Sequence, residues 1–471
     1  MRKTLLTCSA VLSLTVAAET VEFTEETGVL CNPGQGWSSM GRNAAKYEGV
    51  VNVGQVYDRP AWRDFEPQEG VYDWRKLDGF VAYAAKMGLP ATFRIMCACS
   101  RASRPCTPDW VWEKGAKFDE WEEIGYDGNV HTNRAPIFDD ETFLACHRRF
   151  VEKLAERYDG DPRLYGIDLG SYGNFGEWHC SGLPPNCPKA LPRDAEGRIV
   201  RNAPRGKWVK PHVYPLEVRK RYVDMYLDNF RKTEIVFMTD DYECLAYALG
   251  TGTPRVGIRR DGVGSKWHYS RWIGHPPYDK IPVMGDVWKD RPVWFEFYGD
   301  FKNYFLKDGR DIGFAVNWML TNHVSVVNTC PASPADIKDD AEHFPLLRAI
   351  DLYAGARLVP QRCRVERDGR TVRISLEGIN RGAAPVHIPY ELRFAVVGAD
   401  GKDAFSFTGK SDPSKWLPGP FSFEESCALP EGVCGRLVLR LVHRDGVFRN
   451  FRFAAKESLP DGTLPLTKEV P

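Results

Sequence analysis

Eight short apolar runs, most of them separated by helical or long irregular segments, constrain the fold of this chain more than any other feature. They are expected near Pro33 and at 51–57, 91–97, 164–169, 235–239, 256–260, 292–297 and 313–318. Strands that alternate with helices form parallel sheets, and eight such units are what a (β/α)8 barrel requires. We therefore predict an α/β fold in which residues 19–357 form a (β/α)8 TIM barrel.

The pattern changes at about Leu358, where short alternating runs replace the strand–helix order. Examples are Thr371-Val-Arg-Ile-Ser-Leu and Leu437-Val-Leu-Arg-Leu-Val-His, and the turn signals are Asp368-Gly369, Asp400-Gly401 and Asp445-Gly446. Period-2 runs between such turns predict antiparallel strands. Residues 358–471 are therefore expected to form a small β-sandwich, in which we find no catalytic constellation.

The first eighteen residues have the pattern of a secretory signal peptide. Met1-Arg2-Lys3 supplies the charged head, and the apolar stretch ends on small residues at Val16-Ala17-Ala18. The apolar run continues past Cys8, which favours simple cleavage near Ala18 over lipoprotein anchoring. We expect a secreted or periplasmic protein, and no later segment is apolar enough to span a bilayer.

Charge and composition exclude some partners and favour one kind of site. Lysine plus arginine equals aspartate plus glutamate, 63 each, so the chain has no basic footprint for nucleic acid. Aromatic residues make up 12% of the chain and include 14 tryptophans. Part of that surplus is suited to stacking on sugar rings.

The stretch from Leu164 to His179 is the first candidate site. An apolar run breaks into glycines at Gly170, Gly173 and Gly176 and ends on Glu177, Trp178 and His179. A buried strand that leads into a glycine-rich turn places chemistry at the carboxyl end of a parallel sheet. The alternative is a tight turn in which Glu177 only accepts hydrogen bonds from backbone donors.

A second carboxylate interrupts the apolar strand Val293-Trp-Phe-Glu-Phe-Tyr298. A carboxylate at such a position, here Glu296, is costly unless it is paired or functional. Its alternative is a structural glutamate in a salt bridge. Two carboxyl groups, one a proton donor and the other a nucleophile or base, are what glycoside hydrolysis requires.

The region after the second strand resembles a known family. Trp62, Glu66-Pro67, Gly70 and Tyr72-Asp73-Trp74 follow the spacing W-x-x-x-E-P-x-x-G-x-Y-D-[FW] of the family 42 beta-galactosidases, which belong to clan A of the glycoside hydrolases. The resemblance implies an acid/base glutamate after strand four and a nucleophile on strand seven. It thus implies Glu177 as acid/base and Glu296 as nucleophile of a retaining, possibly beta-galactosidase-like, enzyme.

One position departs from the clan pattern, which usually has Asn immediately before the acid/base. Gly176 stands there, and Asn174 lies three positions before Glu177, from where it is expected to reach a sugar hydroxyl. This departure supports an alternative function, a catalytically inactive barrel that binds carbohydrate.

Further residues at strand ends are expected to bind an oligo- or polysaccharide substrate. They are Trp178, His179, Arg94, Tyr57, Asp58, Asp240, Asn317 and Trp318. Each has a structural alternative: Arg94 can form a core ion pair with Asp168, and Asp240 can start a helix.

The residues favour neither a metal nor a cofactor. Cys97, Cys99 and Cys106 lack a histidine or a fourth cysteine at zinc-site spacing. The absence of a His/Asp ligand cluster argues against a metal-dependent deacetylase on the same barrel. Segments 99–139 and 180–212 are expected to form the pocket walls. The sugar, the linkage, exo or endo action and the oligomeric state are not encoded in any motif.

Overall fold

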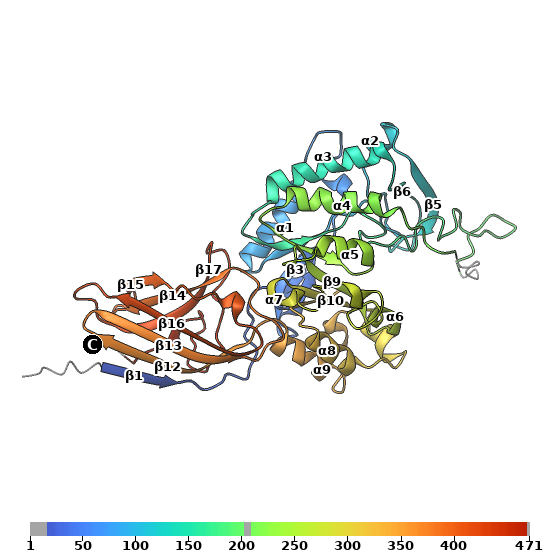
Figure 1. Ribbon diagram of the computed structural model, residues 1–471. Helices are drawn as coiled ribbons and strands as arrows, with labels where there is room; N and C mark the ends of the chain where they lie inside the picture. The colour runs from blue at the N-terminus through green and yellow to red at the C-terminus, as the bar shows by residue number, and fades with distance from the viewer. Residues whose placement is uncertain (1–16, 202–208, 469–471) are drawn as a thin grey trace, which may run out of the picture.

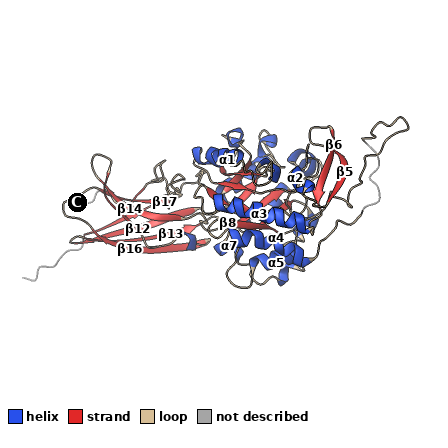
Figure 2. Ribbon diagram, turned by 90° about the horizontal axis from the view of Figure 1, so that it is seen from above, coloured by secondary structure: helices blue, strands red, loops and turns tan. Residues whose placement is uncertain are grey.

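The computed structural model describes residues 17–201 and 209–468, which form two domains lying end to end (Figures 1 and 2). Most of the predicted signal peptide lies outside the described residues. The larger domain is a strand–helix barrel, and the smaller one consists of two antiparallel sheets.

The larger domain is a closed barrel of eight parallel strands, as the sequence predicted. Its strands in chain order are β2 (Gly36–Met40), β3 (Val53–Asp58), β4 (Ala91–Phe93), β7 (Leu164–Asp168), β8 (Glu234–Met238), β9 (Gly257–Val263), β10 (Val293–Phe297) and β11 (Val326–Asn328). β11 pairs with β2 and closes the barrel. β7 and β10 are the fourth and seventh strands, so the strand count that placed Glu177 and Glu296 is confirmed.

Helices surround the barrel. The longer ones are α1 (Arg75–Lys86), α3 (Glu141–Tyr158), α4 (Leu216–Asn229), α5 (Tyr242–Leu249), α8 (Ile312–Thr321) and α9 (Phe344–Tyr353); α2 (Asp109–Glu113), α6 (Lys266–Tyr269) and α7 (Val287–Asp290) are short. α3 begins as expected, because the Asp140 side chain accepts a hydrogen bond from the Phe143 N–H. None of the helices in the described ranges has the length and apolar character needed to cross a membrane.

The expected eighth strand at 313–318 is wrong. That segment belongs to helix α8, whose first N–H groups are capped by Asp311. Its buried residues Ile312, Ala315, Val316 and Met319 recur at helical spacing rather than in alternation. The true eighth strand, β11, is only three residues long and has no clear sequence signal.

Two other expectations need adjustment. The first strand begins at Gly36, after the segment near Pro33 that was expected to contain it. The insertion at 99–139, expected as a pocket wall, contains regular elements that the sequence did not predict: α2 and the antiparallel ribbon of β5 (Phe118–Ile124) and β6 (Val130–Pro136).

The smaller domain contains two antiparallel sheets. One has the order β1–β12–β13–β16 and the other β15–β14–β17–β18. The bounds are β1 (Ala17–Glu22), β12 (Leu358–Asp368), β13 (Thr371–Asn380), β14 (Tyr390–Val397), β15 (Asp403–Thr408), β16 (Gly419–Ala428), β17 (Arg436–His443) and β18 (Leu464–Pro465). Because β1 pairs with β12, residues 17–22 lie with the sandwich and not with the barrel.

The sandwich packs on the barrel at the end opposite to the carboxyl ends of the strands. Tyr165 and Trp294, near the starts of β7 and β10, share one buried cluster with Ile388 of the sandwich. His387 completes the contact, with its ring nitrogens 3.2 Å from Ser325 Oγ and 2.9 Å from the Trp288 carbonyl. The carboxyl end of the barrel, where active sites of this fold lie, is therefore left uncovered by the sandwich.

Candidate active site

The loop after β7 has a strained backbone that alternates its side chains between core and solvent. Phe175 and Trp178 have φ values of 57° and 61°, which non-glycine residues rarely adopt. Phe175, Glu177 and His179 are partly exposed, whereas Asn174 and Trp178 are buried. Strain of this kind is typical of functional sites.

Crowding around the position before Glu177 explains why a glycine occupies it. Gly176 has φ 69°, and a Cβ there would lie 3.1 Å from both the Gly170 Cα and the Ser171 nitrogen. An asparagine would not fit this backbone without displacing it. The departure from the clan pattern is thus a consequence of a loop that folds back on β7.

Glu177 is held by two arginines from neighbouring strands. Arg94 Nη2 and Arg59 Nη1 donate to the same oxygen, Oε1, at 2.8 and 3.1 Å, and His179 Nε2 lies 3.4 Å from Oε2. Burial alone would raise the pKa of Glu177, but Arg94, His179 and Arg59 together hold that pKa well below its usual range. The carboxyl is therefore ionised at neutral pH.

The pKa of Glu296 shifts in the opposite direction. Its Oε2 accepts hydrogen bonds from Arg259 Nη2 at 2.6 Å and from Asn328 Nδ2 at 2.9 Å. Burial and the nearby charge of Asp261 raise the pKa of Glu296 to about 8, in spite of Arg259. Near neutral pH these shifts favour an ionised Glu177 and a protonated Glu296.

A third carboxylate, Asp261, shares Arg259 with Glu296. Arg259 donates from Nε and Nη2 to Asp261 at 2.7 and 3.1 Å, and from Nη1 to the buried Asp168 at 3.0 Å. Asp168 also binds Arg94 at 3.1 Å, which confirms the ion pair considered from the sequence. One hydrogen-bonded network thus connects Glu177 to Glu296.

Tyr57 extends this network through a hydrogen bond to Asp168. Its hydroxyl donates to Asp168 Oδ2 at 2.7 Å, and only 1% of the residue is exposed. Arg94 is fully buried as well. Both residues orient charged groups of the site, and a substrate-binding role for them remains a prediction.

A large cavity opens beside Glu177. Its volume is about 1010 Å³, and its lining includes Glu177, His179, Asp240, Asp261 and Trp267. Asp240 forms ion pairs with Arg260 at 3.0 Å and Arg271 at 3.1 Å. The cavity is large enough for an oligosaccharide and presents both hydrogen-bond donors and acceptors. His179 and Asp240 line this cavity, and their role in substrate binding stays a prediction.

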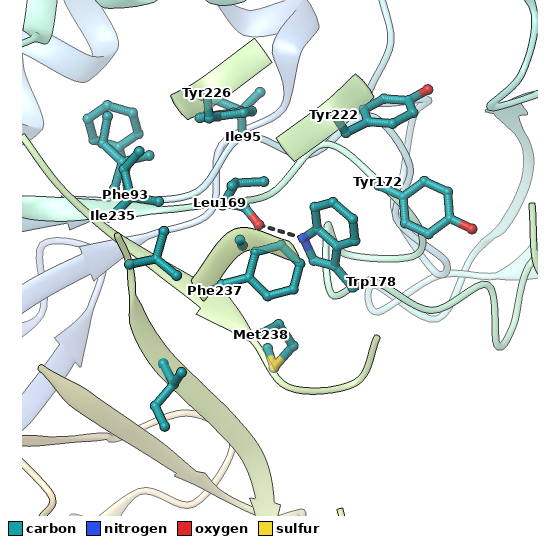
Figure 3. Close-up of a cluster of buried hydrophobic side chains, with 14 of the residues drawn as sticks. Phe93, Ile95, Leu169, Tyr172, Trp178, Tyr222, Tyr226, Ile235, Phe237 and Met238 are labelled. Carbon is teal, nitrogen blue, oxygen red and sulfur yellow. Dashed lines mark hydrogen bonds between the residues drawn. The ribbon is translucent and has the colours of Figure 1, made fainter. Parts of the chain in front are cut away.

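Asn174 and Trp178 support the loop. The Asn174 amide accepts from the Ser100 N–H at 2.8 Å and donates to Ser100 Oγ and the Ser181 carbonyl. The Trp178 indole N–H donates to the Leu169 carbonyl at 2.8 Å, and its ring packs between Tyr172 and Phe237 (Figure 3). Asn174 therefore holds the loop in place, and Trp178, which is only 3% exposed, is mainly a core residue.

Asn317 and Trp318 lie on helix α8, so their expected position at the end of the eighth strand is wrong. Trp318 packs against Trp272 and Phe295, with ring centroids 5.6 and 5.2 Å apart. The residue that does end the eighth strand is Asn328, which contacts Glu296.

Sequence reasoning also missed Arg259 and Asp261 as site residues, although both were visible next to a predicted strand. In the described ranges, no cluster of three or more His, Cys, Asp or Glu side chains has the geometry to hold a metal ion.

Comparison with known proteins supports the resemblance seen in the sequence. Residues 48–180 match the family model described as beta-galactosidase, glycoside hydrolase family 42. This part of the chain is similar to the family 42 glycoside hydrolases. The matched region ends just past Glu177 and contains β3, β4 and β7.

One curated relative and two solved structures illustrate the similarity. A beta-galactosidase of Haloferax lucentense is 27% identical over 106 residues, covering 22% of this chain and only 15% of the relative. An endo-glycoceramidase II from Rhodococcus sp. has a TM-score of 0.38 at 12% identity, covering 87% of this chain and all of that one. Xylanase 10B from Thermotoga petrophila has a TM-score of 0.33 at 10% identity, covering 63% and 82%. At this level of similarity, neither structure bears on the activity.

Proposed function

We propose that this protein is a glycoside hydrolase that cleaves a beta-galactoside-like bond in an oligo- or polysaccharide. The observation that carries the proposal is the position of two carboxyl groups, one after β7 and one near the carboxyl end of β10. Glu177 lines a cavity of about 1010 Å³, and Glu296 is linked to it through Arg259 and Asp168. Export through the leader at residues 1–18 is part of the proposal.

The proposed mechanism is retaining, with a covalent glycosyl intermediate. In this mechanism one carboxyl protonates the leaving oxygen while the other attacks the sugar carbon, and water then releases the product. The family resemblance assigns Glu177 as acid/base and Glu296 as nucleophile. The pKa shifts favour the reverse, because Arg94, His179 and Arg59 lower the pKa of Glu177 whereas burial and Asp261 raise that of Glu296.

The same ion pairs favour one alternative function. Two arginines bind a single oxygen of Glu177 and oppose its protonation. In the family arrangement, Glu177 must be protonated to act as the acid. A barrel that binds carbohydrate without cleaving it would retain this geometry. The alternative predicts glycan binding without turnover.

Glu177→Gln and Glu296→Gln test both functions. We expect each variant to lose hydrolysis of an aryl β-galactoside by at least about 10³-fold while keeping its fold, because the reaction needs both carboxyls. Glu217→Gln, an exposed glutamate on helix α4 that does not line the cavity, is the matched control and should retain activity.

A 2,4-dinitrophenyl galactoside then separates the two roles. Its leaving group needs no protonation, so the acid variant still forms the glycosyl-enzyme in a burst and the nucleophile variant does not. If either variant retains near-wild-type turnover, the substituted residue is not one of the two catalytic carboxyls. Binding without turnover by the wild type supports the alternative function.

A further inference from the structure

A second hollow lies next to Glu177, and the proposed chemistry does not use it. Its volume is about 400 Å³, within the range of small-molecule sites. Asp58 and Arg59 from the end of β3, Arg101 from the loop after β4 and Tyr126 from the β5–β6 turn contribute to its lining. Lys76 of α1 adds a fourth segment, so parts of the chain that are far apart in sequence form it together.

The two hollows meet at the Arg59–Glu177 ion pair. Arg59 lines the smaller hollow and donates to Glu177, which lines the larger cavity. The guanidinium of Arg59 also lies 6.0 Å from the ring centroid of the partly exposed Phe175. A chain that crosses this ion pair would contact both hollows.

Each hollow has an exposed aromatic side chain with an arginine against its ring. Tyr126 is 72% exposed, and the Arg101 guanidinium lies 5.9 Å from its ring centroid. Trp267, on the lining of the larger cavity, is 54% exposed and lies 3.7 Å from Arg271. An exposed ring backed by a cation presents a flat, partly polar face, which is suited to a sugar ring.

Asp58 provides an acceptor in the smaller hollow. Within the described chain, the only hydrogen bond to its side chain comes from the Arg59 backbone N–H, which donates to Oδ1 at 2.8 Å. By contrast, Asp64 nearby is occupied by Lys76 and Arg104. The free oxygen of Asp58 is therefore available to a hydroxyl donor.

We propose that the smaller hollow binds sugar units of the same chain that passes Glu177, with a pyranose ring on Tyr126 and a hydroxyl on Asp58. The ligand is then a β-linked oligosaccharide of three or more units, engaged along its length rather than by a terminal sugar alone. This inference rests on the proposed function for the identity of the ligand class, but it concerns binding and not turnover.

Calorimetric titration tests the proposal with β-1,4-linked galacto-, gluco-, manno- and xylo-oligosaccharides of two to five units. For the series that binds best, we expect the affinity of the wild type to rise by about tenfold from the dimer to the tetramer. Tyr126→Ala should remove this gain and change dimer affinity by less than about twofold. Tyr304→Ala, an exposed tyrosine away from the lining of either hollow, is the matched control.

The outcomes separate this inference from the proposed function. Affinity that stops rising at the dimer, a Tyr126→Ala variant that binds like the wild type, or no binding of any series overturns the inference. Length-dependent binding without hydrolysis overturns only the proposed function. Hydrolysis of aryl glycosides without length dependence overturns only the inference.

Discussion

At the scale of single residues, the neighbours of two chemically identical glutamates shift their pKa values in opposite directions. Glu177 and Glu296 are both largely buried, and burial raises the pKa of each. Arg59 and Arg94 outweigh that effect at Glu177. At Glu296, the charge of Asp261 acts together with burial, and Arg259 does not compensate for them. The position of the proton is therefore decided by side chains from other strands.

The raised pKa of Glu296 predicts a pH dependence of stability. In the folded protein the carboxyl keeps its proton up to about pH 8, whereas in the unfolded chain it loses it near about pH 4.3. Between these values the folded state binds more protons, so the free energy of unfolding falls as the pH rises. Glu296→Gln cannot ionise, and its Tm relative to the wild type should increase from pH 5 to pH 8.

Thermal melts of both proteins across this range check the prediction. Glu243→Gln controls for the substitution of a glutamate near the same cavity. A Tm difference for Glu296→Gln that stays constant between pH 5 and pH 8 would show that Glu296 does not hold the proton.

At the scale of elements, the junction of β7 with its loop depends on close approach between strands. Gly170 follows β7 and lies against the residues that follow β4: a Cβ there would be 2.4 Å from the Ile95 carbonyl oxygen and 2.5 Å from Arg94 Cγ. The glycine is thus required because Arg94 passes over it on the way to Glu177.

Gly170→Ala should displace Arg94 and weaken its contact with Glu177. We expect a loss of about 1–3 kcal/mol in unfolding free energy, the usual effect of overpacking, together with lower activity. Gly252→Ala is the control, because nothing lies within 4 Å of a Cβ at that position. Denaturant unfolding of both variants makes the comparison, and equal stabilities would contradict the proposed packing.

At the scale of the whole molecule, the barrel and the sandwich share a buried cluster. Ile388 of the sandwich lies in it with Tyr165 and Trp294 of the barrel. β1 adds to the same unit, since the start of the described chain pairs with β12 after the barrel. The two domains therefore stabilise each other.

We expect calorimetry to show one cooperative unfolding transition. Ile388→Ala should lower the Tm of the entire protein, at a cost of about 2–5 kcal/mol for a large-to-small change in a core. Leu459→Ala, at a site 47% exposed in the same domain, should have little effect. Two separate transitions, of which only the sandwich transition moves with Ile388→Ala, would contradict this coupling.

The sequence alone determined the parts of this protein that depend on local pattern. Apolar runs alternating with amphipathic helices predicted the barrel, and the count of those runs placed Glu177 after the fourth strand and Glu296 on the seventh. The one wrong strand has a local cause as well: the apolar segment Ile312–Thr321 has the helical period and an Asp311 cap. Short strands such as β11 carry too few residues to show any period.

Only the tertiary structure decided the charges and contacts of the site. Arg259 and Asp168 are 91 positions apart in the chain, and Arg94 and Glu177 are 83 apart. Closure of the barrel brings them together, and no local spacing encodes such pairs. In the folded barrel, Asn174 and Trp178 support the loop after β7 through hydrogen bonds. Asp261 also comes close enough to Glu296 for its charge to act on that carboxyl. The physical reason is that the pKa of a buried carboxyl depends on every charge around it, and those charges come from strands that meet only in the folded barrel.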